Sequence, residues 1–104
     1  MTFNDYGKVV VATPGTKVQV TLNADTVHRL CVAQCETQTG KAYLYVQTNN
    51  GTVMKLRTFE APTSTGLLDK DSFGGVSGNR VQVNTFWVDA DNAGEGLYVY
   101  GEVA

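Results

Sequence analysis

The sequence predicts an all-β protein: an antiparallel, jelly-roll-like β-sandwich of about seven to eight short strands with one long loop. Three observations predict this fold. Apolar and polar residues alternate with a period of two, turn signals separate the alternating runs, and no segment has a convincing helical period. The length of 104 residues corresponds to one domain. We divide the chain into an N-terminal arm, residues 1–6, and a single β-sandwich domain, residues 7–104.

Each expected strand is a short alternating run that ends at a turn signal. The first ends at Thr13-Pro14-Gly15, a turn signature. Asn49-Asn50-Gly51 predicts a hairpin with a type I′ turn, in which both central residues have positive φ. The last two strands are expected to form a second hairpin. The expected strands cover residues 7–12, 16–22, 28–36, 42–48, 52–59, 80–88 and 96–103.

Residues 60–79 form the one long segment without a strand period. Connections of this length are uncommon in compact domains, and when ordered they are usually functional. The segment contains Leu67, Leu68 and Phe73, apolar side chains that a solvated linker does not need. Two interpretations stay open: a loop packed on its own domain, or a surface that contacts a partner.

The charge pattern and the short apolar runs argue against nucleic acid and membrane as partners. The formal net charge is −2, and Lys and Arg are scattered singly, so no basic stripe is present to bind the phosphates of a nucleic acid. The longest apolar run, residues 9–12, is far too short to span a membrane. No Sec-type signal peptide is visible at the amino terminus. We expect neither nucleic acid nor membrane as a partner.

Cys31 and Cys35 are expected to be free thiols. Residues four apart in a strand lie roughly 13 Å apart, beyond the reach of a disulfide. Free thiols fit a protein that folds in a reducing cytosol. A zinc site built from both cysteines and His28 would lack a fourth ligand. We therefore predict no metal and no cofactor.

The acidic stretch "WVDADNAGEGLYVYG", residues 87–101, raises the question of a calcium loop. Asp89, Asp91 and Gly94 match an EF-hand, but Ala93 stands at a ligand position and Tyr100 replaces the bidentate carboxylate, so we reject it. A looser calcium site remains an alternative to the favoured reading, a tight connection between two strands with solvated carboxylates. The two aspartates could be glycosidase-like carboxylates, but the sequence indicates no cleft to hold them apart across a substrate, so we predict no catalytic residue and no enzyme activity.

Tyrosines mark two of the expected strands. Two tyrosines in each strand share a face opposite two aliphatic residues: Tyr43 and Tyr45 opposite Leu44 and Val46, and Tyr98 and Tyr100 opposite Leu97 and Val99. If the aliphatic residues face the core, the four tyrosines form an outward band that suits sugar stacking or protein contact. The alternative is that one pair faces the core. Trp87, alternating with Val81 and Val83, is expected in the core, which weakens the sugar-stacking reading.

Three stretches together resemble a known family. They are "VVVATPGTKVQVTL" at residues 9–22, "HRLCVAQCE" at 28–36 and "NTFWVDADNAGEGLYVYGEV" at 84–103. With this pattern of strands and turns, the chain resembles the small β-sandwich decoration, or cement, proteins of tailed-bacteriophage capsids. The resemblance covers most of the chain and depends on turn chemistry, without any catalytic motif.

The resemblance implies a structural virion protein that binds the outside of a phage capsid and stabilises it. The implied partners are the major capsid protein and further copies of the chain, as a trimer or dimer, assembled in the host cytoplasm. Two alternatives stay open: a carbohydrate-binding β-sandwich module, and a tail or head–tail completion protein of the virion. The residues expected to contact the capsid or another partner are Phe3 and Tyr6 in the arm, Leu67, Leu68 and Phe73 in the long loop, and Tyr98 and Tyr100.

Overall fold

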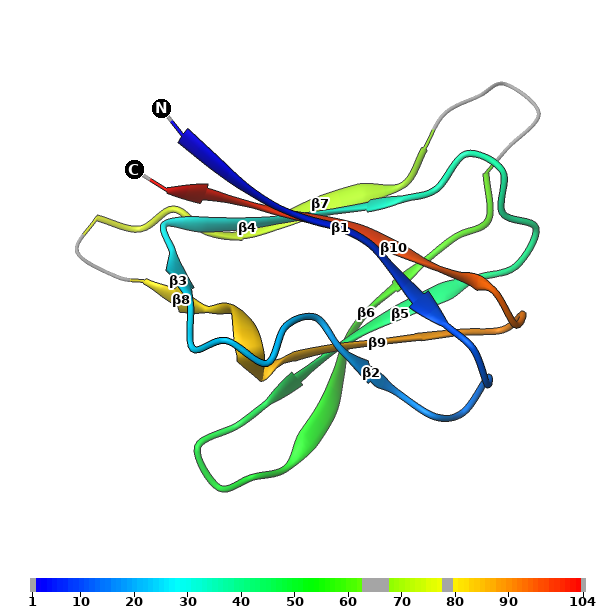
Figure 1. Cartoon of the computed structure of the whole chain (residues 1–104), viewed down its shortest axis with the longest axis horizontal. Helices are drawn as coiled ribbons and strands as arrows, with labels where there is room; N and C mark the ends of the chain where they lie inside the picture. Colours follow the sequence, from blue (N-terminus) through cyan, green and yellow to red (C-terminus); the bar gives the residue numbers. More distant parts are fainter. Residues whose placement is uncertain (1, 63–67, 78–79, 104) are drawn as a thin grey trace.

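The structure, a computed structural model, describes residues 2–62, 68–77 and 80–103. These residues form ten β-strands and one turn of 3-10 helix, with no α-helix among them. Two four-stranded antiparallel sheets lie one above the other as a β-sandwich (Figure 1). The all-β sandwich fold predicted from the sequence is confirmed.

Each sheet draws its strands from distant parts of the chain. Sheet A has the order β1-β10-β4-β7 and sheet B the order β2-β9-β5-β6, while β3 pairs with β8 in a separate two-stranded ribbon. Sheet A consists of β1 (Thr2–Val11), β10 (Glu95–Val103), β4 (Arg29–Gln34) and β7 (Lys70–Gly74). Sheet B consists of β2 (Val18–Gln19), β9 (Phe86–Ala90), β5 (Ala42–Gln47) and β6 (Val53–Phe59). The remaining elements are β3 (Thr26–Val27), β8 (Val81–Gln82) and the 3-10 turn η1 (Val83–Thr85).

The core lies between the two sheets and follows the alternation in the sequence. In β4 and β10 the fully buried residues alternate with half-buried or exposed ones, because successive side chains of a strand point to opposite faces. Leu44, Val88 and Phe59 meet them from sheet B. Each fully buried aliphatic or aromatic side chain contributes about 1.5–3 kcal/mol relative to an exposed one.

The structure contains more strands than the sequence predicted. Residues 16–22 pair only over Val18–Gln19, and β3 and β8 are short additional strands. The expected long loop contains β7, which pairs with β4 along the edge of sheet A. The residues expected to form an arm also differ: Thr2–Tyr6 lie within β1, and most of them pair with β10. The amino terminus is thus part of the sheet that forms the face described below.

The segment expected as one strand over residues 80–88 is interrupted. The 3-10 turn η1 separates β8 from β9, which shifts the alternation by a residue. Phe86 and Val88 point into the core, and Trp87 lies half-buried on the outer side of sheet B. The prediction that Trp87 belongs to the core is therefore wrong, because it assumed an unbroken period of two from Val83 onward.

The last two predicted strands do not form a hairpin. β9 pairs with β2 and β5 in sheet B, and β10 pairs with β1 and β4 in sheet A. The acidic stretch between them is a connection from one sheet to the other. We expected these two strands to pair because they are neighbours in the sequence. Instead they lie in opposite sheets, where each buries its apolar side chains in the core between the layers.

The two glycine-marked turns form where they were predicted, with one difference in type. Thr16 N donates to Thr13 O at 3.0 Å, and Gly15 has a φ of 91°. In the β5–β6 hairpin, Gly51 has a φ of 84° and no non-glycine residue among the described ones has positive φ, which excludes the predicted type I′ turn. Gly51 N donates to Thr48 O and Thr48 N to Thr52 O, as in a type I turn followed by a glycine bulge.

Candidate functional site

Three aromatic rings form a ridge on the outer face of sheet A. Phe3 comes from β1, and Tyr98 and Tyr100 are alternate residues of β10. The ring of Tyr100 lies 5.9 Å from that of Phe3 and 6.5 Å from that of Tyr98, at interplanar angles of 68° and 60°. Phe3 is 52% exposed and Tyr98 39% exposed, although both are large hydrophobic groups. We call these three residues the aromatic ridge.

A bulge in β1 determines which residues join the ridge. The pairing with β10 shifts between Asp5 and Gly7, where Gly7 has a φ of 68°. Asp5 accepts hydrogen bonds from Gly7 N at 2.8 Å and from the Tyr98 hydroxyl at 3.0 Å. Both Asp5 and Lys8 therefore lie on the outer face, paired with Tyr100 and Tyr98.

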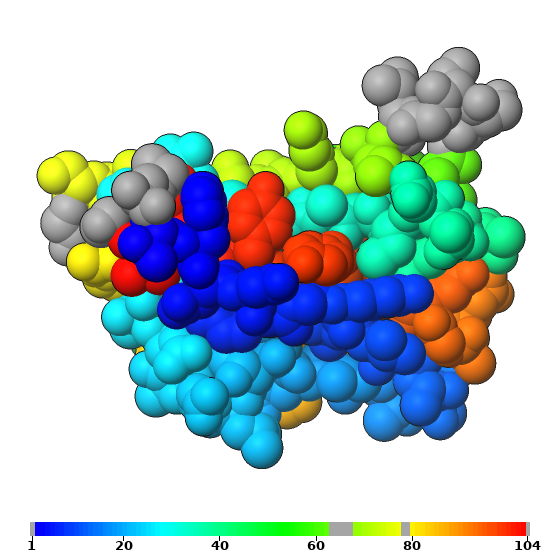
Figure 2. Space-filling view, turned by 45° about the horizontal axis from the view of Figure 1, so that its top comes forward, coloured from blue at the N-terminus to red at the C-terminus, as the bar shows by residue number. Residues whose placement is uncertain are grey.

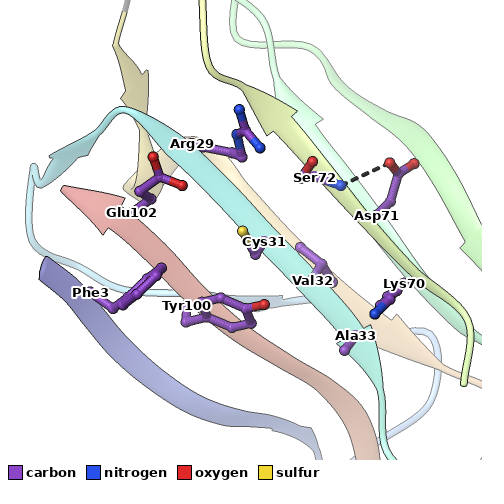
Figure 3. A pocket seen from close by; sticks show the side chains of 10 residues that line it. All are labelled: Phe3, Arg29, Cys31, Val32, Ala33, Lys70, Asp71, Ser72, Tyr100 and Glu102. Carbon is purple, nitrogen blue, oxygen red and sulfur yellow. Dashed lines mark hydrogen bonds between the residues drawn. The ribbon is translucent and has the colours of Figure 1, made fainter. Parts of the chain in front are cut away.

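The residues beside the ridge are small. In β4 these are Cys31 and Ala33, and the residue paired with Cys31 in β7 is Ser72. They line a cavity of about 530 Å³, whose other wall is formed by Phe3 and Tyr100 (Figure 3). We call this cavity the hollow. A second, smaller cavity of about 260 Å³ lies among Phe3, Asp5, Tyr98 and Tyr100.

Figure 2 shows this side of the molecule. The side chains of β10 (orange-red) lie between those of β1 (blue) and those of β4 (cyan to green). On the outer face of sheet A the aromatic rings come from β1 and β10, whereas β4 and β7 contribute the small side chains of Cys31, Ala33 and Ser72.

Charged groups stand at both ends of the hollow. Arg29 and Glu102 are directly paired across β4 and β10, and Lys70 is paired with Ala33 at the other end. Among the described residues neither Arg29 nor Glu102 forms an ion pair, and Arg29 Nε is buried without a hydrogen-bond partner. A Cβ on Gly75 would lie 2.7 Å from Arg29 Nη2, so glycine at this position, with a φ of 83°, makes room for the guanidinium.

The polar groups that line the hollow are better suited to binding a protein side chain than to catalysing a reaction. Burial raises the pKa of the Cys31 thiol, so it is mostly protonated at neutral pH and a weak nucleophile. The neighbouring Cys31 also raises the pKa of Tyr100. The ridge and the middle of the hollow therefore present uncharged side chains that can bind a complementary side chain, while charged groups stand at the ends of the hollow.

The other residues predicted as contacts lie elsewhere. The Tyr6 hydroxyl donates to Asp25 Oδ2 at 3.1 Å, and its ring packs against the core. Phe73 points inward and packs against Phe86, with ring centroids 6.4 Å apart. Leu68 is 37% exposed just before β7. Leu67 lies outside the described residues. Of the predicted contact residues that the structure describes, Phe3, Tyr98 and Tyr100 come together on this face.

The sequence alone does not indicate the half of the face that β4 and β7 form. It marks Cys31 only as a thiol, and it does not by itself single out Arg29, Ala33, Ser72 and Glu102. The sequence feature that marks this half is the pair of small residues on the outer side of β4, Cys31 and Ala33. It becomes readable only when the pairing of β4 with both β10 and β7 is known.

The second tyrosine pair lies on the opposite side of the sandwich. Tyr43 and Tyr45 point outward from β5 in sheet B, as predicted, and Tyr45 pairs with Trp87. Lys55 Nζ lies 4.5 Å from the ring centre of Tyr43, and Lys17 Nζ lies 4.6 Å from that of Tyr45. The two tyrosine pairs cannot form one platform, and lysine side chains already cover the rings of this pair.

The acidic connection is tied to neighbouring backbone and side chains. Asp89 Oδ1 accepts from Gly15 N at 3.0 Å, Asp91 Oδ1 from the Tyr43 hydroxyl at 2.6 Å, and Glu95 Oε1 from Gly40 N at 3.1 Å. Within residues 2–62, 68–77 and 80–103, no three His, Cys, Asp or Glu side chains gather as a metal site would require. The stretch is a connection between strands, as favoured, although it joins two sheets. The expectation that its carboxylates are solvated is wrong for Asp89, which is buried and accepts hydrogen bonds from Gly15 N and Ala90 N.

Comparison of the chain with protein-family models, with curated proteins and with solved structures gives no match. In the part of the chain that the structure describes, no helix is long and apolar enough to cross a membrane. The outer face of sheet A is accordingly interpreted from its own geometry.

Proposed function

We propose that this chain is a structural protein that binds other protein subunits through the outer face of sheet A, and that it serves in a phage particle as a capsid decoration protein. The aromatic ridge beside the hollow is the observation that carries the proposal. A ridge next to a cavity offers both a protruding group and a receptor for one, as protein interfaces do.

The exposed rings supply the driving force for such binding. Aromatic residues are enriched at interfaces and dominate their energetics, and an aromatic anchor that becomes fully buried typically contributes at least about 2 kcal/mol. In the isolated chain about half of the Phe3 surface and two fifths of the Tyr98 surface face water, so part of the free energy that full burial of these rings would give is missing. Covering them with another subunit recovers it.

The same rings are poorly arranged for a sugar, the main alternative. A sugar stacks on the flat face of an aromatic ring, whereas Tyr98, Tyr100 and Phe3 are inclined to one another by 60–68°. The remaining outward tyrosines, Tyr43 and Tyr45, lie under lysine ammonium groups. Rings that are inclined to one another beside a cavity suit irregular protein side chains better than the broad face of a sugar ring.

The capsid context rests on the resemblance of the opening and closing stretches to decoration proteins. In that setting, many identical copies bind a symmetric shell, and each copy adds binding free energy between neighbouring coat subunits. A tail or head–tail completion protein would use the same kind of face in few copies.

The test is the amount of the chain in gradient-purified particles of the phage that encodes it, measured by quantitative gel. We expect copy numbers comparable to those of the coat protein. A Tyr98→Ala/Phe3→Ala variant, expressed in place of the natural chain, should be strongly depleted from the particles. Leu56→Ala, which shortens an exposed side chain on β6 of the other sheet, is the matched control and should remain. Absence of the chain from the particles would refute the proposal, and a few copies per particle would favour a tail or connector role.

A further inference from the structure

The outer face of sheet A divides into a bulky and a small half along the line between β10 and β4. The rows of paired residues give the arrangement. Tyr100 is paired with Cys31, Tyr98 with Ala33, and Glu102 with Arg29. In each row the large or acidic residue stands on β10, and the small or basic residue stands on β4.

This arrangement is complementary to itself under a twofold rotation. An axis parallel to the strands, midway between β10 and β4, exchanges the two halves of the face and keeps each row at the same height. It places Tyr100 of one copy over Cys31 of the other, and Tyr98 over Ala33. An interface of this kind is isologous, because each contact occurs twice with the partners exchanged.

We propose that a second copy of this chain covers the outer face of sheet A, so that the protein forms a twofold dimer in which the aromatic ridge of each copy fills the hollow of the other. This proposal rests on the proposed function and identifies the protein that binds the outer face of sheet A as a second copy of the chain. The dimer is then the unit that enters the larger assembly, with its sheet edges and loops free to contact the coat protein.

Shape supports the second copy as occupant. The hollow has a volume of about 530 Å³. Cavities of a few hundred cubic ångströms accommodate drug-sized ligands, so the hollow has room for two tyrosine rings, those that the rotation places over Cys31 and Ala33. Phe3 belongs to the same row as Gly74 at the far edge, and the rotation places the largest side chain of that row over the residue that has none.

Charge supports it as well. The rotation places Glu102 of each copy over Arg29 of the other, which gives two symmetric ion pairs between groups that lack one among the described residues of a single copy. Lys8 and Lys70 meet at the margins, where their long side chains extend into solvent.

The area is sufficient. Four strands at a spacing of about 4.8 Å and a mean length of about 25 Å form a face of roughly 500 Å² per copy, or about 1,000 Å² for the pair. Specific interfaces begin at about this size. The dimer is therefore expected to dissociate on dilution, which makes it measurable.

Sedimentation velocity of the purified chain, from low-micromolar to submillimolar concentration, tests the proposal without any capsid. We expect a monomer–dimer equilibrium. Arg29→Glu should weaken the dimer about tenfold or more, because it places two carboxylates opposite each other twice. The double variant Arg29→Glu/Glu102→Arg restores opposite charges and should recover dimerisation. Lys55→Glu, on sheet B, is the matched control and should dimerise like the natural chain.

A second variant tests shape. Ala33→Trp fills the hollow from an outward-facing position, so the chain should keep its fold by circular dichroism while the dimer is lost. A chain that stays monomeric at every concentration would overturn the proposal, as would a dimer unaffected by Arg29→Glu and Ala33→Trp. Failure of the charge exchange to recover the dimer would overturn the twofold pairing. A monomer that still enters phage particles would refute the dimer alone, and a dimer absent from particles would refute the proposed function alone.

Discussion

At Glu95 a single carboxylate holds together two segments that are far apart in the sequence. It accepts hydrogen bonds from Thr39 N at 3.0 Å, from Gly40 N at 3.1 Å and from the side chains of Thr39 and Asn92. Burial raises the pKa of Glu95, but the hydrogen bonds from these donors outweigh it, so its pKa lies below the ordinary value. The acidic stretch that suggests a metal ligand in the sequence thus contains a residue that fixes a loop.

Replacing Glu95 by Gln should lower the free energy of unfolding by about 1 kcal/mol at neutral pH, because a neutral amide accepts weaker hydrogen bonds than a carboxylate. A carboxylate with a lowered pKa contributes stability above its unfolded pKa, and this contribution is lost as the pH falls through the folded pKa. The variant should therefore lose less stability than the natural chain on acidification. Urea unfolding at neutral and acidic pH measures both effects.

Glu36→Gln is the control for this variant, since Glu36 is exposed in the same loop region. It removes a carboxylate that makes none of the hydrogen bonds of Glu95, so the free energy of unfolding at neutral pH should stay unchanged. An equal loss of stability on acidification in the Glu95 variant and the natural chain would contradict the assigned role.

Single residues also show what alternation in a sequence can predict. The outward direction of Tyr43, Tyr45, Tyr98 and Tyr100 is confirmed, because each lies in an unbroken strand whose aliphatic neighbours are buried. The direction of Trp87 was wrong, because a short 3-10 turn upstream changed the phase. A period of two holds only within one element, and nothing in the sequence marked that turn.

At the scale of elements, Arg57 joins the edges of the two sheets. It extends from β6 in sheet B to the start of β7 in sheet A, where its guanidinium lies 2.5 Å from Oδ1 of Asp69, just before the strand, and 3.2 Å from Oδ2 of Asp71, within it. It also donates to Lys70 O at 3.2 Å and stacks over the ring of Phe59, 4.6 Å from its centre. These contacts hold β7 in place without a continuous hydrogen-bond ladder between the sheets.

Replacing Arg57 by Ala should lower the free energy of unfolding by about 1–2 kcal/mol, since it removes charge-assisted hydrogen bonds that are partly shielded from water. Arg57→Lys should recover only part of this loss, because an ammonium group lacks the planar fork that reaches both aspartates. Thermal or urea unfolding of the three chains gives the comparison. Equal stability of the Ala variant and the natural chain would show that β7 is held by its pairing with β4 alone.

The elements differ in how readily the sequence predicts them. β4 and β5 carry regular alternation, and the Asn-Gly turn marks the start of β6, so all three are predicted close to their true bounds even though a bulge interrupts the pairing of β6 with β5. β7, with the sequence "KDSFG", has a single apolar side chain and was read as loop, since its strand conformation depends on pairing with β4. β9 and β10 were identified as strands, but their neighbours were not, because local pattern carries no information about which sheet a strand joins.

For the whole molecule, the sandwich has two faces with different character. Sheet B presents tyrosines covered by lysines, and sheet A presents open aromatic rings beside a cavity. The sequence predicted the β-sandwich and an aromatic surface. It could not predict that Phe3 joins Tyr98 and Tyr100, because that contact depends on the pairing of the first strand with the last.

The pairing of the first and last strands also changes what the first residues can do. Thr2–Tyr6 are part of the sheet, and Phe3 completes the ridge from the edge strand. Removing them would uncover Tyr100 and shorten β1 as well as delete a contact residue. The substitution Phe3→Ala, which leaves the backbone in place, therefore separates binding from folding better than a truncation does.

The central claim is that the outer face of sheet A is covered by protein when the chain is assembled. Hydroxyl-radical footprinting by mass spectrometry, on the chain in purified particles and on the dilute isolated chain, tests it most directly. We predict that oxidation of Phe3 and Tyr98 falls severalfold on assembly, while oxidation of Met54, exposed on β6 of the other sheet, stays the same. Equal oxidation of Phe3 and Tyr98 in both states would contradict the claim.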